Sequence, residues 1–326
     1  RGGVESLLSH KLITLVRGKA SFKDPHTVTV GDEEYSADYI IIATGSVSAS
    51  LPVPGADLEG ILTSKEILDI EELPKKLCVI GGGVIGLEFA SVFRSFGSDV
   101  TVLEYCKEVL PHFDADLAKR LRSSLGKRGI EISTQSQVTA IAKNEEGYTI
   151  SYMRKGKEES IDADKVLMAV GRKPNVFSLN LDDAGIGYGP RGIAVNENMQ
   201  TNVPHIYAVG DINGRMMLAH AAVFQGIVAL DHIMGMQNHV DLSVMPAAVF
   251  TSPEAAGVGM TEDECKEKGI PVKCLKSFFR ANGKAVTMAE TDGFCKLIVA
   301  AEPKEGFTSP YEPGRILGCH LYGPHA

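Results

Sequence analysis

Three glycines, at residues 81, 83 and 86, separate a short apolar run (77–80) from a segment whose apolar residues have helical spacing. In a G-x-G-x-x-G pattern the first glycine permits a tight turn and the second lets a pyrophosphate approach the backbone. The third lets the helix pack closely on the strand. The N-terminus of that helix offers free N–H groups and its positive dipole end to phosphates. We therefore predict a dinucleotide-binding loop made of Gly81, Gly82, Gly83, Val84, Ile85 and Gly86.

An acidic residue ends the next strand-like run, 99–104, and lies 21 residues after Gly83 (104 − 83). A carboxylate at this distance accepts a hydrogen bond from the ribose 2′-OH of the dinucleotide. The same carboxylate would repel a 2′-phosphate. Glu104 therefore predicts NAD(H) rather than NADP(H), and the chemistry that goes with it is hydride transfer.

Several elements must position this loop. Alternating apolar residues predict antiparallel strands at 12–16 and 27–30, and an entirely apolar run at 39–42 is typical of a parallel strand covered on both faces. Helical spacing predicts helices at 63–72 (with Ser64 or Thr63 as N-cap), 114–128 and 219–234. Beyond about residue 240 the pattern indicates a separate α+β domain, with strands near 249–251, 271–276, 293–300 and 315–321 and a short helix at 261–269. A capping box, Thr261 with Glu264, begins that helix.

Composition excludes several classes of protein. The 326 residues are 44% hydrophobic and 23% charged, as in a globular protein with a sizeable core. A formal charge of −8 argues against nucleic acid or an anionic membrane as partner, and we predict neither. The six cysteines form no C-x-x-C pair and no zinc-ligand spacing, so we expect reduced thiols, a cytoplasmic protein and no metal site. The chain begins without Met, which suggests an internal piece of a longer protein.

Two further strand-to-glycine junctions flank the loop, at 43–46 (Ala-Thr-Gly-Ser) and 209–211 (Val-Gly-Asp), with 169–175 (Ala-Val-Gly-Arg-Lys-Pro-Asn) between them. In this order they resemble the pyridine nucleotide–disulfide oxidoreductases. The resemblance implies an α/β fold of the FAD/NAD-linked disulfide reductase type, with a Rossmann-like NAD domain inserted in a partial FAD domain and followed by a partial interface domain. The implied boundaries are 1–66 and 176–239 for the FAD domain, 67–175 for the NAD domain, and 240–326 for the interface domain.

Within that family the chain most resembles the branch that oxidises dihydrolipoamide, on segments 218–222, 250–262, 281–285 and 316–320. This resemblance implies FAD and NAD as cofactors, a homodimer, and dihydrolipoamide on the lipoyl domains of 2-oxo acid dehydrogenase or glycine cleavage complexes as substrate. Two alternatives stay open. One is another disulfide reductase of the family, acting on mercuric ion, coenzyme A disulfide or glutathione disulfide, and the other is a non-catalytic NAD-binding module.

The resemblance also implies roles for single residues. Asp211 would accept a ribitol hydroxyl of FAD, and Glu88 would reach the contact between flavin and nicotinamide as the catalytic candidate of this chain. Val138 and Gly171 would touch NAD on its adenosine and nicotinamide sides, and Arg172 would clamp the cofactor loop. Further residues would line FAD: Gly18, Thr44, Gly45, Ser46, Met217, Leu218, Ala219 and His220.

Three parts of the family pattern are absent from this sequence: a first FAD-binding glycine loop, a C-x-x-x-x-C redox pair and a His–Glu base pair. A low-pKa thiolate and an oriented histidine carry the family's thiol chemistry. We therefore expect the 326 residues to bind NAD(H) through the nearly self-contained segment 67–175 but to be inactive alone.

Overall fold

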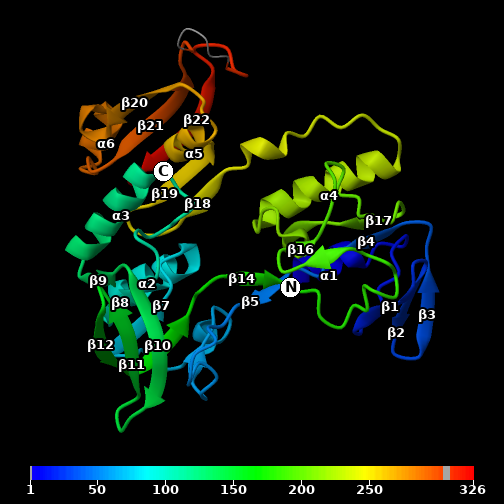
Figure 1. The fold of residues 1–326 in the computed structure, drawn as a ribbon, viewed down its shortest axis with the longest axis horizontal. Helices are drawn as coiled ribbons and strands as arrows, with labels where there is room; N and C mark the ends of the chain where they lie inside the picture. The colour runs from blue at the N-terminus through cyan, green and yellow to red at the C-terminus, as the bar shows by residue number, and fades with distance from the viewer. Residues whose placement is uncertain (1, 304–308) are drawn as a thin grey trace. The chain divides into compact units, whose positions relative to one another are not determined.

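The computed structural model describes residues 2–303 and 309–326. The chain divides into two compact units, one comprising Arg1–Val47 with Lys173–Leu242 and the other Ser48–Arg172 with Ser243–Ala326. The chain passes between them in β5 (Ser46–Ser48) and β14 (Arg172–Pro174), which pair with each other, and again after residue 242. Figure 1 traces these elements by colour along the chain. Each unit is described separately below.

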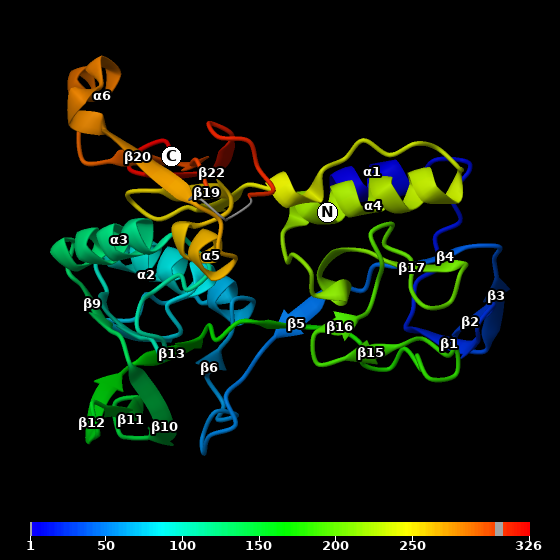
Figure 2. The same cartoon turned by 45° about the horizontal axis from the view of Figure 1, so that its top comes forward.

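The first unit begins with helix α1 (Gly2–Leu8) and a three-stranded antiparallel sheet of β1 (Ala20–Asp24), β2 (Thr27–Val30) and β3 (Glu33–Ser36), visible in Figure 2. Strand β4 (Ile40–Ile42) pairs in parallel with β17 (Ile206–Ala208), so segments from the two ends of this unit share one core. The remaining elements are the short pair β15 (Tyr188–Gly189) and β16 (Gly192–Ile193), the 3-10 turn η2 (Gly210–Asn213), helix α4 (Ala219–Ile233) and the 3-10 turn η3 (Leu242–Val244), which straddles the boundary.

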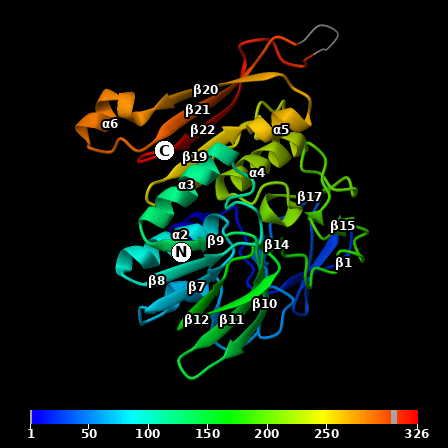
Figure 3. The ribbon, with the colours of Figure 1, turned by 60° about the vertical axis from the view of Figure 1, so that its left-hand side comes forward.

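The second unit contains a parallel sheet in the order β6-β13-β7-β8-β9. Its strands are β6 (Ile61–Leu62), β7 (Lys76–Ile80), β8 (Asp99–Leu103), β9 (Ile130–Ser133) and β13 (Lys165–Met168). After Lys76, every residue of β7 is buried, as expected for a strand covered on both faces. Helices α2 (Val84–Phe96) and α3 (Ala115–Lys127) follow β7 and β8, and β10 (Ser136–Lys143), β11 (Tyr148–Arg154) and β12 (Lys157–Ala163) form an antiparallel sheet, shown in Figure 3.

The C-terminal part of the same unit is a five-stranded antiparallel sheet in the order β18-β19-β22-β21-β20. Its strands are β18 (Ala247–Val249), β19 (Ala255–Gly259), β20 (Val272–Phe278), β21 (Phe294–Ala300) and β22 (Ile316–Tyr322). Helix α5 (Glu262–Glu267) starts at the predicted capping box of Thr261 and Glu264, which the structure confirms. The 3-10 turn η4 (Phe279–Ala281) and helix α6 (Gly283–Thr287) complete this part.

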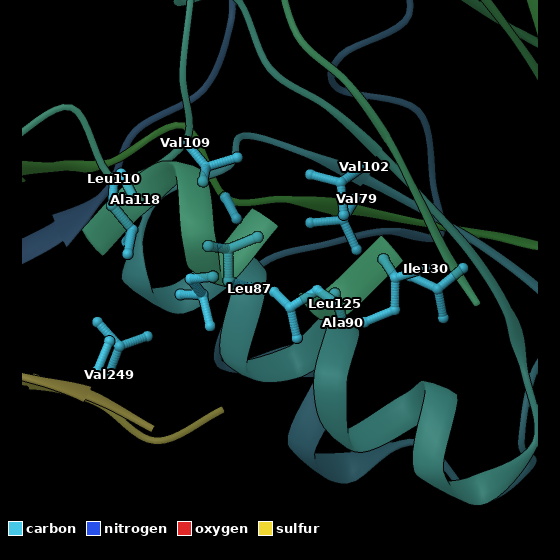
Figure 4. Packing of buried hydrophobic residues seen from close by; sticks show 14 of the residues in the cluster. Val79, Leu87, Ala90, Val102, Val109, Leu110, Ala118, Leu125, Ile130 and Val249 are labelled. Atoms are coloured by element: carbon cyan, nitrogen blue, oxygen red, sulfur yellow. The ribbon is translucent and has the colours of Figure 1, made fainter. Parts of the chain in front are cut away.

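One hydrophobic core joins the parallel sheet and its helices to the five-stranded antiparallel sheet. Leu87 and Ala90 of α2 and Leu125 of α3 pack against Val79 of β7, and Val249 from β18 belongs to the same cluster (Figure 4). All five side chains are fully buried. At about 25 cal/mol per Å² of apolar surface, such shared burial is the main force joining these elements.

Two predicted elements are wrong. Residues 12–16 form no strand, and Leu12 and Leu15 are 83% and 48% exposed, because their alternating pattern meets no partner strand. The predicted helix 63–72 is only the 3-10 turn η1 (Glu66–Asp69), whose N-cap is Lys65. Its single buried residue, Ile67, gives a longer helix little apolar surface to bury. Within the described residues, no helix is long and apolar enough to cross a membrane.

A buried ion cluster links α3 to the five-stranded antiparallel sheet. Lys296 of β21, 1% exposed in its side chain, donates to both oxygens of Asp114 (3.0 and 2.9 Å), to Asp116 (2.7 Å) and to Glu262 (2.8 Å). Burial opposes the charge of Lys296, but its hydrogen bonds to Asp116, Glu262 and Asp114 outweigh burial and raise its pKa. Asp114 also caps α3 by accepting from the Asp116 amide. The cluster therefore fixes the first turn of α3.

Stability should depend on pH through this cluster. Hydrogen bonds from Lys276 and Lys296 lower the pKa of Asp116 to about 2, and those from Lys266 and Lys296 lower the pKa of Glu262 to about 2. A carboxyl group with a lowered folded-state pKa stabilises the fold above its unfolded-state pKa, and that stability is lost as pH falls through the folded-state value. We expect the free energy of unfolding to fall between pH about 4.5 and about 2. Urea titrations at several pH values would measure this. An equally steep decline in a Lys296→Met variant would contradict the assignment.

Candidate dinucleotide-binding site

The glycine loop has the conformation that the spacing predicts. Gly81, directly after β7, has φ +112°, and a Cβ there would lie 2.3 Å from the carbonyl oxygen of Ala169. A Cβ on Gly86 would lie 2.0 Å from the carbonyl oxygen of Gly81. Contacts below 3 Å of this kind cannot be relieved by moving a side chain, because the obstructing atoms belong to the backbone. The tight turn and the close packing of strand and helix therefore require glycine at both positions.

Gly83 differs from these two, because its Cα faces open space. It is the N-cap of α2 with extended backbone (φ −78°, ψ −174°), and a Cβ built on it meets no described atom within 4 Å. In the part of the chain that the structure describes, no side chain caps the first amides of α2. Exposed N–H groups at a helix N-terminus, beside an open cradle that a Cβ would fill, fit a bound pyrophosphate. The residues present thus fit the phosphates of a dinucleotide.

Glu104 follows the end of β8 and is turned back onto the loop. Its carboxylate accepts from the amide of Gly82 (2.5 Å) and from that of Cys106 (2.6 Å), and the residue is only 7% exposed. Each carboxylate oxygen retains capacity for a second hydrogen bond. The structure therefore brings Glu104 to the glycine loop, as the spacing predicts. It adds a role in holding the loop that the sequence pattern did not indicate.

Glu88 lies on α2, four residues after the N-terminal turn begins at Val84. Its carboxylate accepts from the amide of Phe250 (2.8 Å), and Ser91 one turn further accepts from the amide of Ser252 (3.1 Å). Both contacts join α2 to the loop after β18. The predicted approach of Glu88 to a flavin stays a prediction, since no described contact tests it.

In the first unit, the two predicted FAD segments meet. The hydroxyl of Ser46 donates to the carboxylate of Asp211 (2.5 Å), although 165 residues separate them. Gly45 has φ +70°, and its carbonyl accepts from the amide of Asn175 (2.9 Å). Thr44 donates through its hydroxyl to the carbonyl of Asn175 (3.1 Å). Three stretches that are distant in the sequence thus form one polar junction. A ligand hydroxyl could replace the Ser46 hydroxyl there as a donor to the Asp211 carboxylate.

Sequence reasoning missed a buried glutamine that supports this junction. Gln225 of α4, 2% exposed, accepts from the amide of Gly210 (2.8 Å) and from the side-chain amide of Asn213 (2.8 Å). It thereby holds the turn that carries Asp211. A polar residue at a core position of helix 219–234 was the available signal, because a buried amide needs partners.

The other predicted residues lie at scattered places in their units. Val138 of β10 is buried in the hydrophobic cluster that residues of the parallel sheet and of the β10-β11-β12 sheet share. The carbonyl of Gly171 accepts from the amide of Ala49 (2.9 Å), and Arg172 begins β14. Leu218 is the N-cap of α4, preceded by Met217 and followed by the exposed Ala219 and His220. A Cβ on Gly18 would lie 2.3 Å from the Val30 side chain. Their contacts with cofactors stay predictions.

Comparison with known proteins agrees with this geometry. Residues 1–226 match the family described as pyridine nucleotide-disulphide oxidoreductase, and residues 245–326 match the dimerisation domain of the same family. The chain is 40% identical to a dihydrolipoyl dehydrogenase of Geobacillus stearothermophilus and 39% identical to one of Bacillus subtilis. Each alignment covers all of this chain and 68% of the relative.

Among solved structures, the chain is similar to the HOCl-induced flavoprotein disulfide reductase RclA from Escherichia coli. The TM-score is 0.85 at 28% sequence identity, over 99% of this chain and 72% of that one. The fold predicted from the motifs is therefore confirmed. The chain belongs to the pyridine nucleotide-disulphide oxidoreductase family, whose members are enzymes that use FAD and NAD(H).

Proposed function

We propose that this chain is the NAD-binding and interface portion of an enzyme that oxidises dihydrolipoamide and reduces NAD⁺. The observation that carries the proposal is the open N-cap at Gly83 beside the buried carboxylate of Glu104. The names of the relatives at about 40% identity support dihydrolipoamide as the substrate rather than another disulfide. FAD, when bound, would take electrons from the dithiol and supply them to NAD⁺ as hydride.

In this proposal the loop binds the pyrophosphate and Glu104 binds the ribose of the adenosine diphosphate moiety. The exposed amides at the start of α2 would donate to the pyrophosphate, and Glu104 would accept from the ribose 2′-OH with its remaining lone pairs. The amides of Gly82 and Cys106 already bind the carboxylate, so it is held in place before the ligand arrives. Preorganisation of this kind reduces the ordering cost of binding.

The polar junction of Ser46 and Asp211 is proposed to bind the ribitol of FAD. A ribitol hydroxyl would donate to the Asp211 carboxylate, while Gln225 keeps the turn in place through the Gly210 amide. The roles proposed for Thr44, Gly45 and the start of α4 rest on the same family pattern. The four domain segments predicted from the sequence, 1–66, 67–175, 176–239 and 240–326, are proposed together with these roles.

The proposed partners are a second copy of the chain and lipoyl domains that carry dihydrolipoamide. The match of residues 245–326 to a dimerisation domain supports the homodimer. We further propose that the 326 residues alone bind NADH but do not turn over dihydrolipoamide, because their sequence has no C-x-x-x-x-C pair to accept the electrons.

Two measurements test the proposal. Calorimetry with NADH should detect one site per chain, and a failure to bind at millimolar NADH would refute the NAD(H) site. The product of the complete gene should reduce NAD⁺ with dihydrolipoamide faster than it acts on glutathione disulfide, coenzyme A disulfide or mercuric ion. A clear preference for one of the others would assign the chain to a different disulfide reductase, of which RclA is a structural example.

Replacement of Glu104 by glutamine tests the preference for the nucleotide. Glutamine keeps one acceptor oxygen for the Gly82 or Cys106 amide but removes the charge that disfavours a 2′-phosphate. We expect NADH affinity to fall about tenfold, as for the loss of one charge-assisted hydrogen bond, and NADPH affinity to fall less or rise. Titrations with both nucleotides measure the ratio. An unchanged ratio would show that Glu104 only holds the loop.

A further inference from the structure

Two thiols that the proposed function does not use lie side by side on the five-stranded antiparallel sheet of the second unit. The sulfur atoms of Cys295 on β21 and Cys319 on β22 are 3.9 Å apart. Both residues are half-buried. In the strand register Cys295 is opposite Leu321 and Cys319 is opposite Leu297, so the two cysteines are diagonal neighbours on one face of the sheet.

The 3.9 Å separation decides between two kinds of thiol chemistry. A disulfide needs sulfurs about 2.05 Å apart and Cα atoms no more than about 6.8 Å apart, whereas diagonal neighbours in an antiparallel pair have Cα atoms about 7–8 Å apart. A disulfide would therefore require the strands to move. Two thiolates on one tetrahedral Zn²⁺, each at about 2.3 Å, lie about 3.8 Å apart. The observed spacing matches the shared ion without movement of the strands.

We propose that Cys295 and Cys319 form a two-thiolate binding site for a soft divalent cation of the Zn²⁺ class. Thiolates are the ligands that such cations prefer. Within the described residues no group of three or more His, Cys, Asp and Glu side chains is placed to hold a metal. The site therefore supplies two ligands and leaves the remaining positions to water or to an exogenous ligand. The residues opposite the two cysteines in the strand register, Leu321 and Leu297, are apolar and offer no ligand.

Binding replaces two thiol protons by one cation, so that each Zn²⁺ forms two Zn–S bonds and releases two protons to the buffer. The cation must displace both thiol protons, so the apparent affinity rises with pH, up to tenfold per unit for each proton released. A slope of two protons identifies a site that uses both sulfurs, whereas a slope of one identifies a single thiolate.

The experiment titrates Zn²⁺ and Co²⁺ into the reduced, metal-free 326-residue chain. We expect one equivalent of Co²⁺ to give a thiolate-to-metal charge-transfer band that Zn²⁺ abolishes, with an affinity that increases about 100-fold per pH unit. Cys295→Ser and Cys319→Ser should each weaken binding at least tenfold. Cys274→Ser is the matched control, because Cys274 on β20 is opposite Ile298 and therefore on the other face, and it should bind as the unmodified chain does.

A second measurement needs no variant. Zn²⁺ should protect Cys295 and Cys319 from alkylation by iodoacetamide while Cys106, also half-buried, reacts at its usual rate. Three outcomes would overturn the proposal: no charge-transfer band, a band that persists in both serine variants, or mass spectra showing a Cys295–Cys319 disulfide with no bound metal. This site is independent of NADH binding, so its failure would leave the proposed function intact.

Discussion

Replacing Lys296 with methionine is expected to lower the free energy of unfolding by about 3–5 kcal/mol. Methionine fills a similar volume but leaves the carboxylate of Asp114, 1% exposed in its side chain, without its cation. The penalty arises mainly from that stranded charge and less from the lost attraction. Asp116 and Glu262 are more exposed and can recover hydration. Urea unfolding of the variant and the unmodified chain measures the difference.

Lys276 provides the matched control. Its ammonium group is 2.8 Å from Asp116, in the same cluster, but its side chain is 37% exposed. Exposed ion pairs contribute about 0–1 kcal/mol, so Lys276→Met should cost less than about 1 kcal/mol. Equal effects of the two substitutions would show that the cluster is no more than a surface network. A double variant, Asp114→Asn with Lys296→Met, should recover part of the stability because it removes the stranded charge.

Replacing Gly83 with alanine is expected to weaken NADH binding about 100-fold while leaving stability within about 0.5 kcal/mol of the unmodified chain. The open space at Gly83 accommodates a Cβ in the unliganded chain, and φ of −78° suits alanine. The pyrophosphate must approach this same point, so the methyl group would separate it from the α2 amides. The loss of two charge-assisted hydrogen bonds accounts for a change of this size. Calorimetry and thermal unfolding measure the two quantities.

Two other glycines provide control positions for this prediction. Gly126, in α3, is equally open, so Gly126→Ala should leave NADH binding unchanged and stabilise the helix by up to about 1 kcal/mol. Gly86→Ala should instead destabilise the fold, because its Cβ would overlap the Gly81 carbonyl. If Gly83→Ala bound NADH with unchanged affinity, the open N-cap would not be the phosphate site.

Much of the parallel sheet could be predicted from the sequence, because its signals are local. The strand–glycine–helix pattern that begins at residue 77 depends on residues within a few turns of one another, and α3 (Ala115–Lys127) lies within one residue of the predicted bounds 114–128. The failures at 12–16 and 63–72 have a common cause. Alternation and helical spacing report what a segment could bury, and neither segment found enough partner surface.

The candidate site divides in the same way. The spacing of Glu104 from Gly83 predicted its place near the loop, but not that the Gly82 and Cys106 amides would bind its carboxylate. The family resemblance assigned Ser46 and Asp211 to the same cofactor, but not their hydrogen bond to each other, because the two residues are 165 positions apart in the sequence. The burial and pairing of Lys296 could not be predicted, because the sequence around a lysine in an apolar strand is the same whether its ammonium group reaches solvent or a buried carboxylate.

The sequence by itself therefore predicted a dinucleotide-binding loop and its preference for NAD(H), and it determined the family, which the comparisons confirm. These follow from residue types whose conformational and charge requirements are met by near neighbours: a glycine at φ +112°, a helix N-terminus, and an acid at the end of the next strand. Only the tertiary structure decided which charges are buried and paired. It also placed the sulfurs of Cys295 and Cys319 in contact and showed what supports Asp211. Burial and long-range contact depend on how distant segments pack, and no local pattern records that packing.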